Sequence, residues 1–580
     1  MALSPMMEHY LTIKENYKDC IVFYRLGDFY EMFFEDAIKA SEILGLTLTG
    51  RDCGLKERAP MCGVPFHAAD LYISKLVAAG EKVAICEQMT EPNGKNLVER
   101  EIVRIVSAGT VTNDELIDAK TNNYLLSLYL TKHEAAIAWA DITTGDFYAE
   151  SFICNDVLLS LINEMVRISP VEIIANRNAI ETLSETPVFA QGVLPKISVF
   201  TESEFDEKIA QKTLKEQLNV KDLTVFGFKS DKDVSVIPAG ALVAYLKETQ
   251  KNALYNINTV NIVDGNEFML IDQNAVRNLE LTRSLREGKR YGSLLWVLDK
   301  TKTSMGARLL QNWILSPLTD KDEIDRRLNG VESLYNDTVI RKSVSDVLSS
   351  VKDIGRISGK ISNGNVNPKD CIALSYSLSA LPNIRFQLLG IRSDFIEDIV
   401  NDFYDYGDVV SLIEKAIYVD RTEETDEKRK IQTKKTVRYI KEGYNAELDE
   451  LRSLASGGVK EIDAIEAKER EKTGIKTLKV SYNRVFGYYI EITNSFKDRV
   501  PFDYVRKQTL ANAERYVTQE LKELEEKVLT ATEKAEILDA KLFAEIKEQL
   551  IERAKSWARS ASSAARSPGA RRCWGRGAAS

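Results

Sequence analysis

Histidine and paired cysteine are scarce in this sequence. Its 580 residues include three histidines and seven cysteines, and no two cysteines form a Cys-x-x-Cys pair. Scattered histidines leave little room for a histidine-based metal centre. Cysteines without a regular spacing are typical of reduced thiols in the cytoplasm rather than of a disulfide framework. We therefore expect a cytoplasmic protein without a metal site.

Long apolar runs are also missing. No run approaches the roughly 20 residues that span a bilayer, and residues 1–5 lack the basic and apolar regions of a secretory signal. We expect no membrane contact. The formal net charge of −9 argues against a surface coated with nonspecific nucleic-acid contacts. It leaves room for DNA binding by basic residues gathered on small surfaces.

A phosphate-binding loop is the third absence. The chain contains no Gly-x-x-x-x-Gly-Lys-[Ser/Thr] pattern. The nearest approach, Gly355–Ile361, has the wrong spacing and lacks the hydroxyl residue, so we interpret it as structural. We predict that this chain is not an enzyme, binds no cofactor and does not hydrolyse ATP.

The last residues differ in composition from the rest. Residues 556–580 contain no acidic residue and use arginine without lysine. A natural basic tail that binds DNA and a frameshift or joining artefact after about Lys555 both explain this composition. We favour the artefact.

The body of the chain has the composition of a folded protein, 44% hydrophobic and 28% charged, and its length suggests about three to five domains. The first part mixes strands and helices. We predict a helix from Ser4-Pro5, a β-rich run over 21–26 and a helix that turns Ala37, Ala40 and Leu44 inward. Further strands are expected over 46–49, 83–86 and 102–106, with a helix over 68–79.

A second α/β domain follows a polar linker. Three strand-like runs (124–130, 135–141 and 146–152), a helix over 157–166 and a strand over 171–174 predict a ribonuclease-H-like layout. That fold can carry metal-dependent nuclease chemistry, which needs carboxylates on particular strands. Asp141 and Glu164 are present, but the first strand has no carboxylate. We interpret the domain as a structural connector and keep a metal-dependent nuclease as the alternative.

From about Gly265 the pattern becomes helical. The apolar run 294–298 predicts core residues. Two long helices are expected over 426–456 and 521–550, each reaching roughly 45 Å. Between them, 477–482 and 487–493 predict strands. One long helix would lead out to a small β-rich tip and the other would lead back.

Two groups of residues are candidates for DNA contact. The β-rich tip holds cationic and amide side chains that suit phosphates, namely Lys479, Arg484, Arg506, Lys507, Asn512 and Arg515. Near the N-terminus, the Gly27-Asp28 turn signal would present Phe29 and Glu31 on the same side. An exposed aromatic ring can wedge into a base stack, and a carboxyl group beside it can hydrogen-bond a displaced base, especially if protonated. The alternative is a core strand, to which most rings of 23–34 would belong.

From about Ser4 to Lys555 the chain resembles the MutS family of bacterial DNA mismatch-repair proteins. The resemblance rests on motifs in the family's order, which are Gly-Asp-Phe-Tyr-Glu at 27–31, Pro60–His67, Val83–Gln88, Gly292–Asp299, Gly487–Ile490 and Gln508–Tyr516. It implies that Phe29 stacks on a mispaired base and kinks the duplex while Glu31 hydrogen-bonds that base. It also implies that Arg51 and Arg100 contact the DNA backbone near the lesion.

The resemblance further implies a multidomain fold. We expect an α/β mismatch-binding domain (1–112), a ribonuclease-H-like connector (124–250), a mostly helical core with the first lever helix (265–458), a small β-rich clamp (459–518) and a second lever helix (519–555). The clamp residues would grip the backbone of mismatched double-stranded DNA. The longer family members continue into a module that uses ATP and magnesium and mediates dimerisation, so dimerisation of this chain is doubtful. A MutL-type repair partner is implied by the family.

Overall fold

The computed structural model describes residues 3–54, 57–90, 98–113, 117–132, 134–152, 157–190, 192–251, 254–263, 268–418, 438–483 and 487–564. The chain divides into two compact units. The first holds Met1–Val366, Tyr376–Tyr406 and Ile551–Ser580, and the second holds Asn367–Ser375 and Gly407–Leu550. None of the helices in the described ranges is both long and apolar enough to cross a membrane.

The first unit begins with a six-stranded sheet of order β3-β4-β2-β1-β5-β6. Only the β1–β5 pair is parallel. The strands are β1 (Cys20–Leu26), β2 (Phe29–Phe33), β3 (Thr49–Arg51), β4 (Ala59–Pro65), β5 (Lys82–Gln88) and β6 (Arg100–Val106). The strand expected over 46–49 was wrong, because Gly45 ends the preceding helix in a left-handed conformation and pairing with β4 starts only at Thr49. Strand β4 was not predicted, and β2 lies within residues 23–34, for which a core strand was the alternative.

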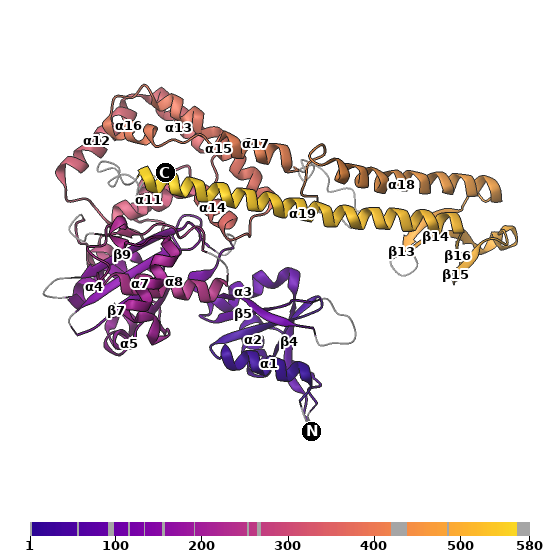
Figure 1. Ribbon diagram of the computed structural model, residues 1–580, viewed down its shortest axis with the longest axis horizontal. Helices are drawn as coiled ribbons and strands as arrows, with labels where there is room; N and C mark the ends of the chain where they lie inside the picture. Colours follow the sequence, from indigo (N-terminus) through magenta and orange to yellow (C-terminus); the bar gives the residue numbers. More distant parts are fainter. Residues whose placement is uncertain are drawn as a thin grey trace. The chain divides into compact units, whose positions relative to one another are not determined.

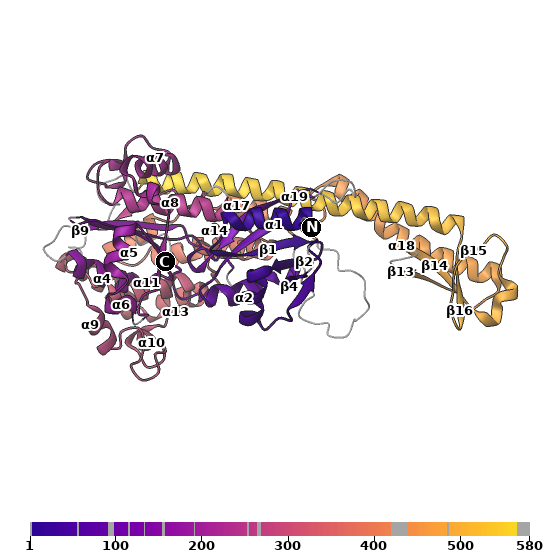
Figure 2. The same cartoon turned by 90° about the horizontal axis from the view of Figure 1, so that it is seen from below.

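Helices cover both faces of this sheet, α1 (Pro5–Asn16) on one face and α2 (Phe34–Leu44) and α3 (Ala69–Ala78) on the other. Figure 2 shows α1 and α2 on opposite sides. Ala37, Ala40 and Leu44 are buried as predicted. This arrangement buries Met32 and Phe33, at the end of β2, in the apolar layers of the two faces, while Phe29 at its start is exposed.

The second sheet has the order β11-β10-β7-β8-β9-β12. Its strands are β7 (Leu125–Leu130), β8 (Ala135–Asp141), β9 (Asp146–Phe152), β10 (Glu172–Ala175), β11 (Ile197–Val199) and β12 (Asn261–Ile262). The three predicted strands, which pair antiparallel, and the later strand are confirmed. Its helices are α4 (Val157–Ile168), α5 (Arg177–Leu183), α6 (Pro187–Ala190), α7 (Glu207–Leu218) and the almost wholly buried α8 (Val236–Gln250).

Helices follow from α9 (Gln273–Asn278). They are α10 (Leu294–Leu298), α11 (Ser304–Leu315), α12 (Lys321–Asn336), α13 (Thr338–Leu348), α14 (Ile354–Ser362), α15 (Pro368–Leu388) and α16 (Asp394–Asn401). The expectation that the run 294–298 is core was wrong for four of its five residues. Because α10 is little more than one turn, only Leu295 is buried, whereas Leu294, Trp296, Val297 and Leu298 are exposed.

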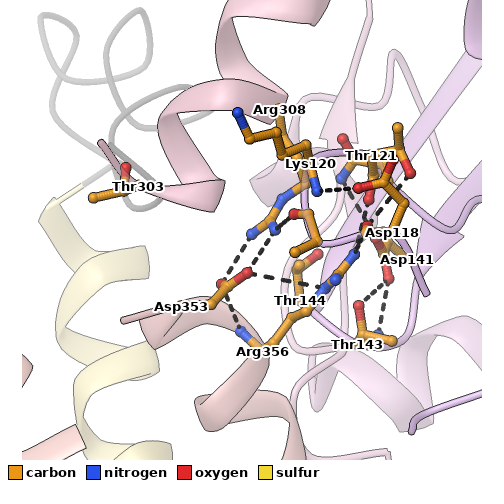
Figure 3. A network of polar contacts seen from close by, with 12 residues as sticks. Asp118, Lys120, Thr121, Asp141, Thr143, Thr144, Thr303, Arg308, Asp353 and Arg356 are labelled. Carbon is orange, nitrogen blue, oxygen red and sulfur yellow. Dashed lines mark hydrogen bonds and ion pairs between the residues drawn. The ribbon is translucent and has the colours of Figure 1, made fainter. Parts of the chain in front are cut away.

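A buried polar network joins the connector to the helical core (Figure 3). Arg308 of α11 forms a two-pronged ion pair with Asp353 and donates to the carbonyl of Ala119. Arg356 of α14 donates to the carbonyls of Asp118 and Thr121 at 3.2 and 2.8 Å. Two guanidinium groups therefore bind the backbone that enters the connector.

The glycine-rich stretch 355–361 lies within α14 at this junction. A Cβ atom at Gly359 would lie 2.0 Å from the carbonyl oxygen of Thr143. The glycine thus permits close approach of α14 to the connector. This packing role agrees with the structural interpretation of the stretch.

The second unit contains α17 (Gly407–Ala416), α18 (Ala446–Thr473), most of α19 (Gln519–Ala564) and a four-stranded sheet (Figure 1). The strands are β13 (Lys479–Asn483), β14 (Gly487–Thr493), β15 (Val505–Thr509) and β16 (Ala513–Val517), in the order β13-β14-β16-β15. Ion pairs Arg452–Asp539 and Lys468–Glu520 join α18 to α19. The sheet follows α18 and precedes α19, as predicted for the tip.

The helix expected over 426–456 was wrong at both ends, because among the described residues the helix starts later and ends later. Residues 426–437 lie outside the described residues, and the helix starts at Ala446, where the Asn445 side chain accepts from the Leu448 amide. It ends only at Gly474, whose φ of 67° closes the last turn. The expected boundary between first lever and clamp at 458 therefore falls inside α18. Ion pairs with α19 lie on both sides of Gly457-Gly458, where glycine weakens a helix, and they support α18 there.

Candidate nucleic-acid interface

The first candidate element is a hairpin between β1 and β2. Leu26 pairs with Phe29 across a two-residue turn, in which Gly27 takes a φ of 60°. This left-handed conformation suits glycine. Phe29 starts β2 with 46% of its surface exposed, while Tyr30 on the other face is buried. Most other rings of the 23–34 run are buried as predicted, so Phe29 is the aromatic ring that the hairpin leaves at the surface.

Glu31 lies on the same face of β2 as Phe29, two residues further along. Its carboxylate forms an ion pair with Arg51 of β3, and the two side chains are 16% and 36% exposed. Gly63 of β4 pairs with Glu31, and a Cβ at Gly63 would lie 3.5 Å from Cγ of Glu31. Arg51 reaches Glu31 across the intervening strand β4. Phe29 and the Glu31–Arg51 pair thus lie on the same face of the sheet.

Arg100 does not join this group. It is 7% exposed, donates to the carbonyls of Arg25 and Val98 at 2.9 Å and lies over the ring of Tyr24 at 5.0 Å. The predicted backbone contact does not fit this position, because the guanidinium is turned to carbonyl groups inside the domain. Arg100 instead ties β6 to the end of β1.

The second candidate element is the four-stranded sheet of the second unit. One face carries its apolar core with Ile490, Ile492 and Tyr516. On the other face the register aligns Lys479, Glu491, Arg515 and Gln508 in one row. Alternation along the strands thus separates the core from a polar face.

Exposure separates the predicted clamp residues. Lys479, Arg506, Lys507 and Asn512 are exposed. A register shift between Arg506 and Gln508 breaks the alternation of β15, so Arg506 and Lys507 both reach the surface. Asn512 lies in the turn between β15 and β16. Arg484 lies outside the described residues.

Arg515 has partners within the sheet. It donates to Glu491 at 3.1 Å and to Gln508 at 2.9 Å, and it stacks over Tyr489 at 4.2 Å. Its side chain is 17% exposed. The predicted contact with DNA fits this position poorly, because the cation is occupied by its neighbours. The register places Arg515 in the middle of the polar row, between Glu491 and Gln508, a position that residue type alone does not reveal.

A buried carboxylate balances the cations near β15. Glu514 is 3% exposed and accepts from Lys497 at 2.7 Å and from the Tyr516 hydroxyl, while Arg506 lies 3.5 Å away. The hydrogen bonds from Lys497 and Tyr516 lower the pKa of Glu514. A negative charge therefore orients Arg506 at the surface.

The connector carboxylates considered for nuclease chemistry have internal partners. Asp141 is fully buried and accepts from the amide of Asn123, and from the amide and hydroxyl of Thr143. Glu164 is paired with Arg167. In the described ranges no group of three or more metal-binding side chains is gathered. Both carboxylates serve the fold.

The order of parts is that of the DNA mismatch-repair class of proteins: an α/β domain with an exposed aromatic-carboxylate hairpin, a second α/β domain, and a helical domain whose paired long helices carry a small sheet. Family models match in the same order, MutS domain I over residues 4–115, MutS domain II over 123–258 and MutS domain III over 274–566. The chain belongs to the MutS family.

Curated relatives agree with this assignment. The chain is 46% identical over 566 residues to the DNA mismatch repair protein MutS of Ruminiclostridium cellulolyticum, an alignment that covers 96% of this chain and 63% of the relative. It is 44% identical over 554 residues to the protein of that name from Lachnoclostridium phytofermentans, covering 95% and 58%. The chain thus spans roughly three fifths of the length of these relatives.

Proposed function

We propose that this chain recognises mismatched or unpaired bases in duplex DNA and serves DNA mismatch repair. The observation that carries the proposal is the exposed Phe29 at the start of β2, with Glu31 on the same face. Family membership supports it, because the relatives are named for mismatch repair.

Physical chemistry connects this geometry to the task. A protein that inserts an aromatic ring between base steps must unstack and bend the duplex. A mispaired step stacks poorly, so the deformation costs less there than at a paired step. Phe29 would act as the wedge. Glu31 would hydrogen-bond the displaced base, and Arg51 beside it would reach a phosphate.

The sheet of the second unit would supply contacts that do not depend on sequence. Its exposed cations and amide, Lys479, Arg506, Lys507 and Asn512, suit phosphate oxygens. Arg484 stays in the proposal on the strength of the family resemblance. We leave out Arg100 and Arg515, whose side chains are largely buried against their protein partners. Cooperation with a MutL-type partner is likewise a proposal.

The test compares binding to a homoduplex with binding to the same duplex carrying one G·T mispair, at a stated salt concentration. Base–aromatic stacking is worth about 1–3 kcal/mol, so Phe29→Ala should reduce the preference for the mispair by roughly 5- to 150-fold. Leu48→Ala is the matched control, since Leu48 is 45% exposed in the same domain. Equal binding of both duplexes by the folded wild-type chain would contradict the proposal. Magnesium-dependent nicking would favour the nuclease alternative.

A further inference from the structure

Arg25 binds the turn of the hairpin that carries Phe29, from the face opposite to the Phe29 side chain. The Nε atom of Arg25 donates to the carbonyl of Gly27 at 2.5 Å. Its guanidinium carbon lies 3.8 Å from the ring centre of Phe66 and 5.4 Å from that of Tyr30. The Arg25 side chain is 17% exposed. It therefore bridges the turn and two aromatic rings in a half-buried position.

Phe66 holds the other residue of the turn. Its backbone amide donates to the carbonyl of Asp28 at 3.0 Å. Phe66 directly follows Pro65, which pairs with Phe29. Both turn carbonyls thus have a donor, one from the Arg25 side chain and one from the Phe66 backbone. The Phe66 ring also stacks on the Arg25 guanidinium.

Glu87 completes the support. Its carboxylate accepts from the Tyr30 hydroxyl and lies 3.9 Å from Arg25. Burial and the bond to Glu87 raise the pKa of Tyr30 well above its ordinary value, so the hydroxyl stays a donor. Arg25 consequently has a negative charge beside it when it binds the turn.

The register places Arg25 and Tyr30 on the face of the sheet opposite to Phe29 and Glu31. Arg25 pairs with Tyr30, whereas Leu26 pairs with Phe29 and Tyr24 pairs with Glu31. Directly opposed residues share a face, so Arg25 and Tyr30 lie on the face away from Phe29 and Glu31. A force on the Phe29 ring would be transmitted to the turn, and hydrogen bonds from Arg25 and Phe66 hold the turn in place.

We propose that Arg25 and Phe66 are positioning residues that hold the Phe29 hairpin rigid for insertion at a mispair. This inference rests on the proposed function. A wedge on a loose turn would lose part of its stacking energy in ordering the turn, so rigidity should appear as preference for the mispair. Phe66 is 42% exposed although it contacts Arg25 and the turn. Its ring can therefore be replaced without disturbing the core.

The test measures the preference for a G·T duplex over the homoduplex in Phe66→Ala and Arg25→Gln. We expect each to reduce the preference at least about fivefold while homoduplex affinity changes less than about twofold. Ile38→Ala is the matched control, because Ile38 is also 42% exposed in the same domain. Arg25→Lys, which keeps the charge but loses the planar group, should recover only part of the preference. Unchanged preference in both variants would overturn the inference.

A double variant separates positioning from direct contact. If Phe66 acts through Phe29, Phe66→Ala should cost little in a chain that already carries Phe29→Ala. Additive losses would mean that Phe66 contacts DNA itself and would overturn the positioning role. If Phe66→Ala does not fold, Phe66→Leu, which keeps a comparable apolar volume without the ring, decides instead. A wild-type chain without any preference for the mispair contradicts the proposed function. A wild-type preference that survives in these variants contradicts only the positioning role of Arg25 and Phe66.

Discussion

The network at the connector–core junction gives the sharpest stability prediction, for Asp353→Ala (Figure 3). The Asp353 carboxylate accepts from both terminal nitrogens of Arg308, at 2.6 and 3.0 Å, and from the amide of Arg356, where it caps α14. Burial alone would raise the pKa of Asp353, but the hydrogen bonds and charge of Arg308 lower it below its ordinary value. Asp353 is therefore a charged partner for two buried cations.

The magnitude follows from what the substitution leaves behind. The side chain of Arg308 is 5% exposed and that of Arg356 is 2% exposed, so neither guanidinium can regain water without opening the junction. Removing one partner of a buried pair costs about 3–5 kcal/mol, and this value includes much of the lost helix cap. Asp325→Ala breaks the Lys321–Asp325 pair, whose side chains are 84% and 51% exposed. That control should cost at most about 0.5 kcal/mol.

Calorimetry and hydrogen exchange measure the effect. A loss of about 3–5 kcal/mol should lower the melting temperature of the affected transition by roughly 6–20 °C. Exchange should rise first in α14 and in residues 118–121, because these segments share the network. Asp353→Asn keeps an acceptor for the Arg356 amide and should fall between wild type and Asp353→Ala. A melting temperature for Asp353→Ala no lower than that of Asp325→Ala would refute this reasoning.

Three further outcomes are expected. In a double-mutant cycle, Glu31→Gln and Arg51→Gln should show coupling of about 0.5–1 kcal/mol in mispair preference, because the two form an ion pair; additive effects would contradict this. Hydrogen bonds from Lys120 and neighbouring groups outweigh burial and lower the pKa of Asp299 to about 2, below its unfolded value of about 3.9. Stability should therefore fall as the pH drops from about 4 to 2. Asp299→Asn should flatten that part of a curve of melting temperature against pH. Arg506→Gln should lower the salt dependence of homoduplex binding by about 0.9 in log–log slope, whereas an equal change in Arg515→Gln would contradict the sheet-internal role of that residue.

Local patterns in the sequence predict much of this fold. Strand-like apolar runs located β7, β8 and β9, and spacing of three and four located the long α19. The Gly27-Asp28 signal located the hairpin turn. Each of these signals lies within a few residues of the element that it describes. They succeed because turn chemistry and burial pattern agree locally.

Features that depend on distant partners were not predicted. Strand β4 contains Pro60 and Gly63, which resemble loop residues until the pairing with β2 and β3 is known. The extent of α18 depends on contacts with α19 more than on its own glycines. Most side chains of α10 are exposed because neighbouring elements can cover only a small part of a helix of about one turn. Sequence periodicity does not contain this information, because tertiary contacts override local preference.

Charge shows the same limit and also explains the candidate interface. Arginine at 100 and at 515 has the residue type of a phosphate contact, yet backbone carbonyls occupy the first and a carboxylate and an amide occupy the second. At 25 the guanidinium binds a turn carbonyl and an aromatic ring. Arginine suits such sites because its planar group donates in several directions and stacks on rings. We therefore expect substitutions of Arg25, which holds the hairpin turn, to reduce mispair preference, and substitutions of exposed cations such as Lys507 to reduce general affinity.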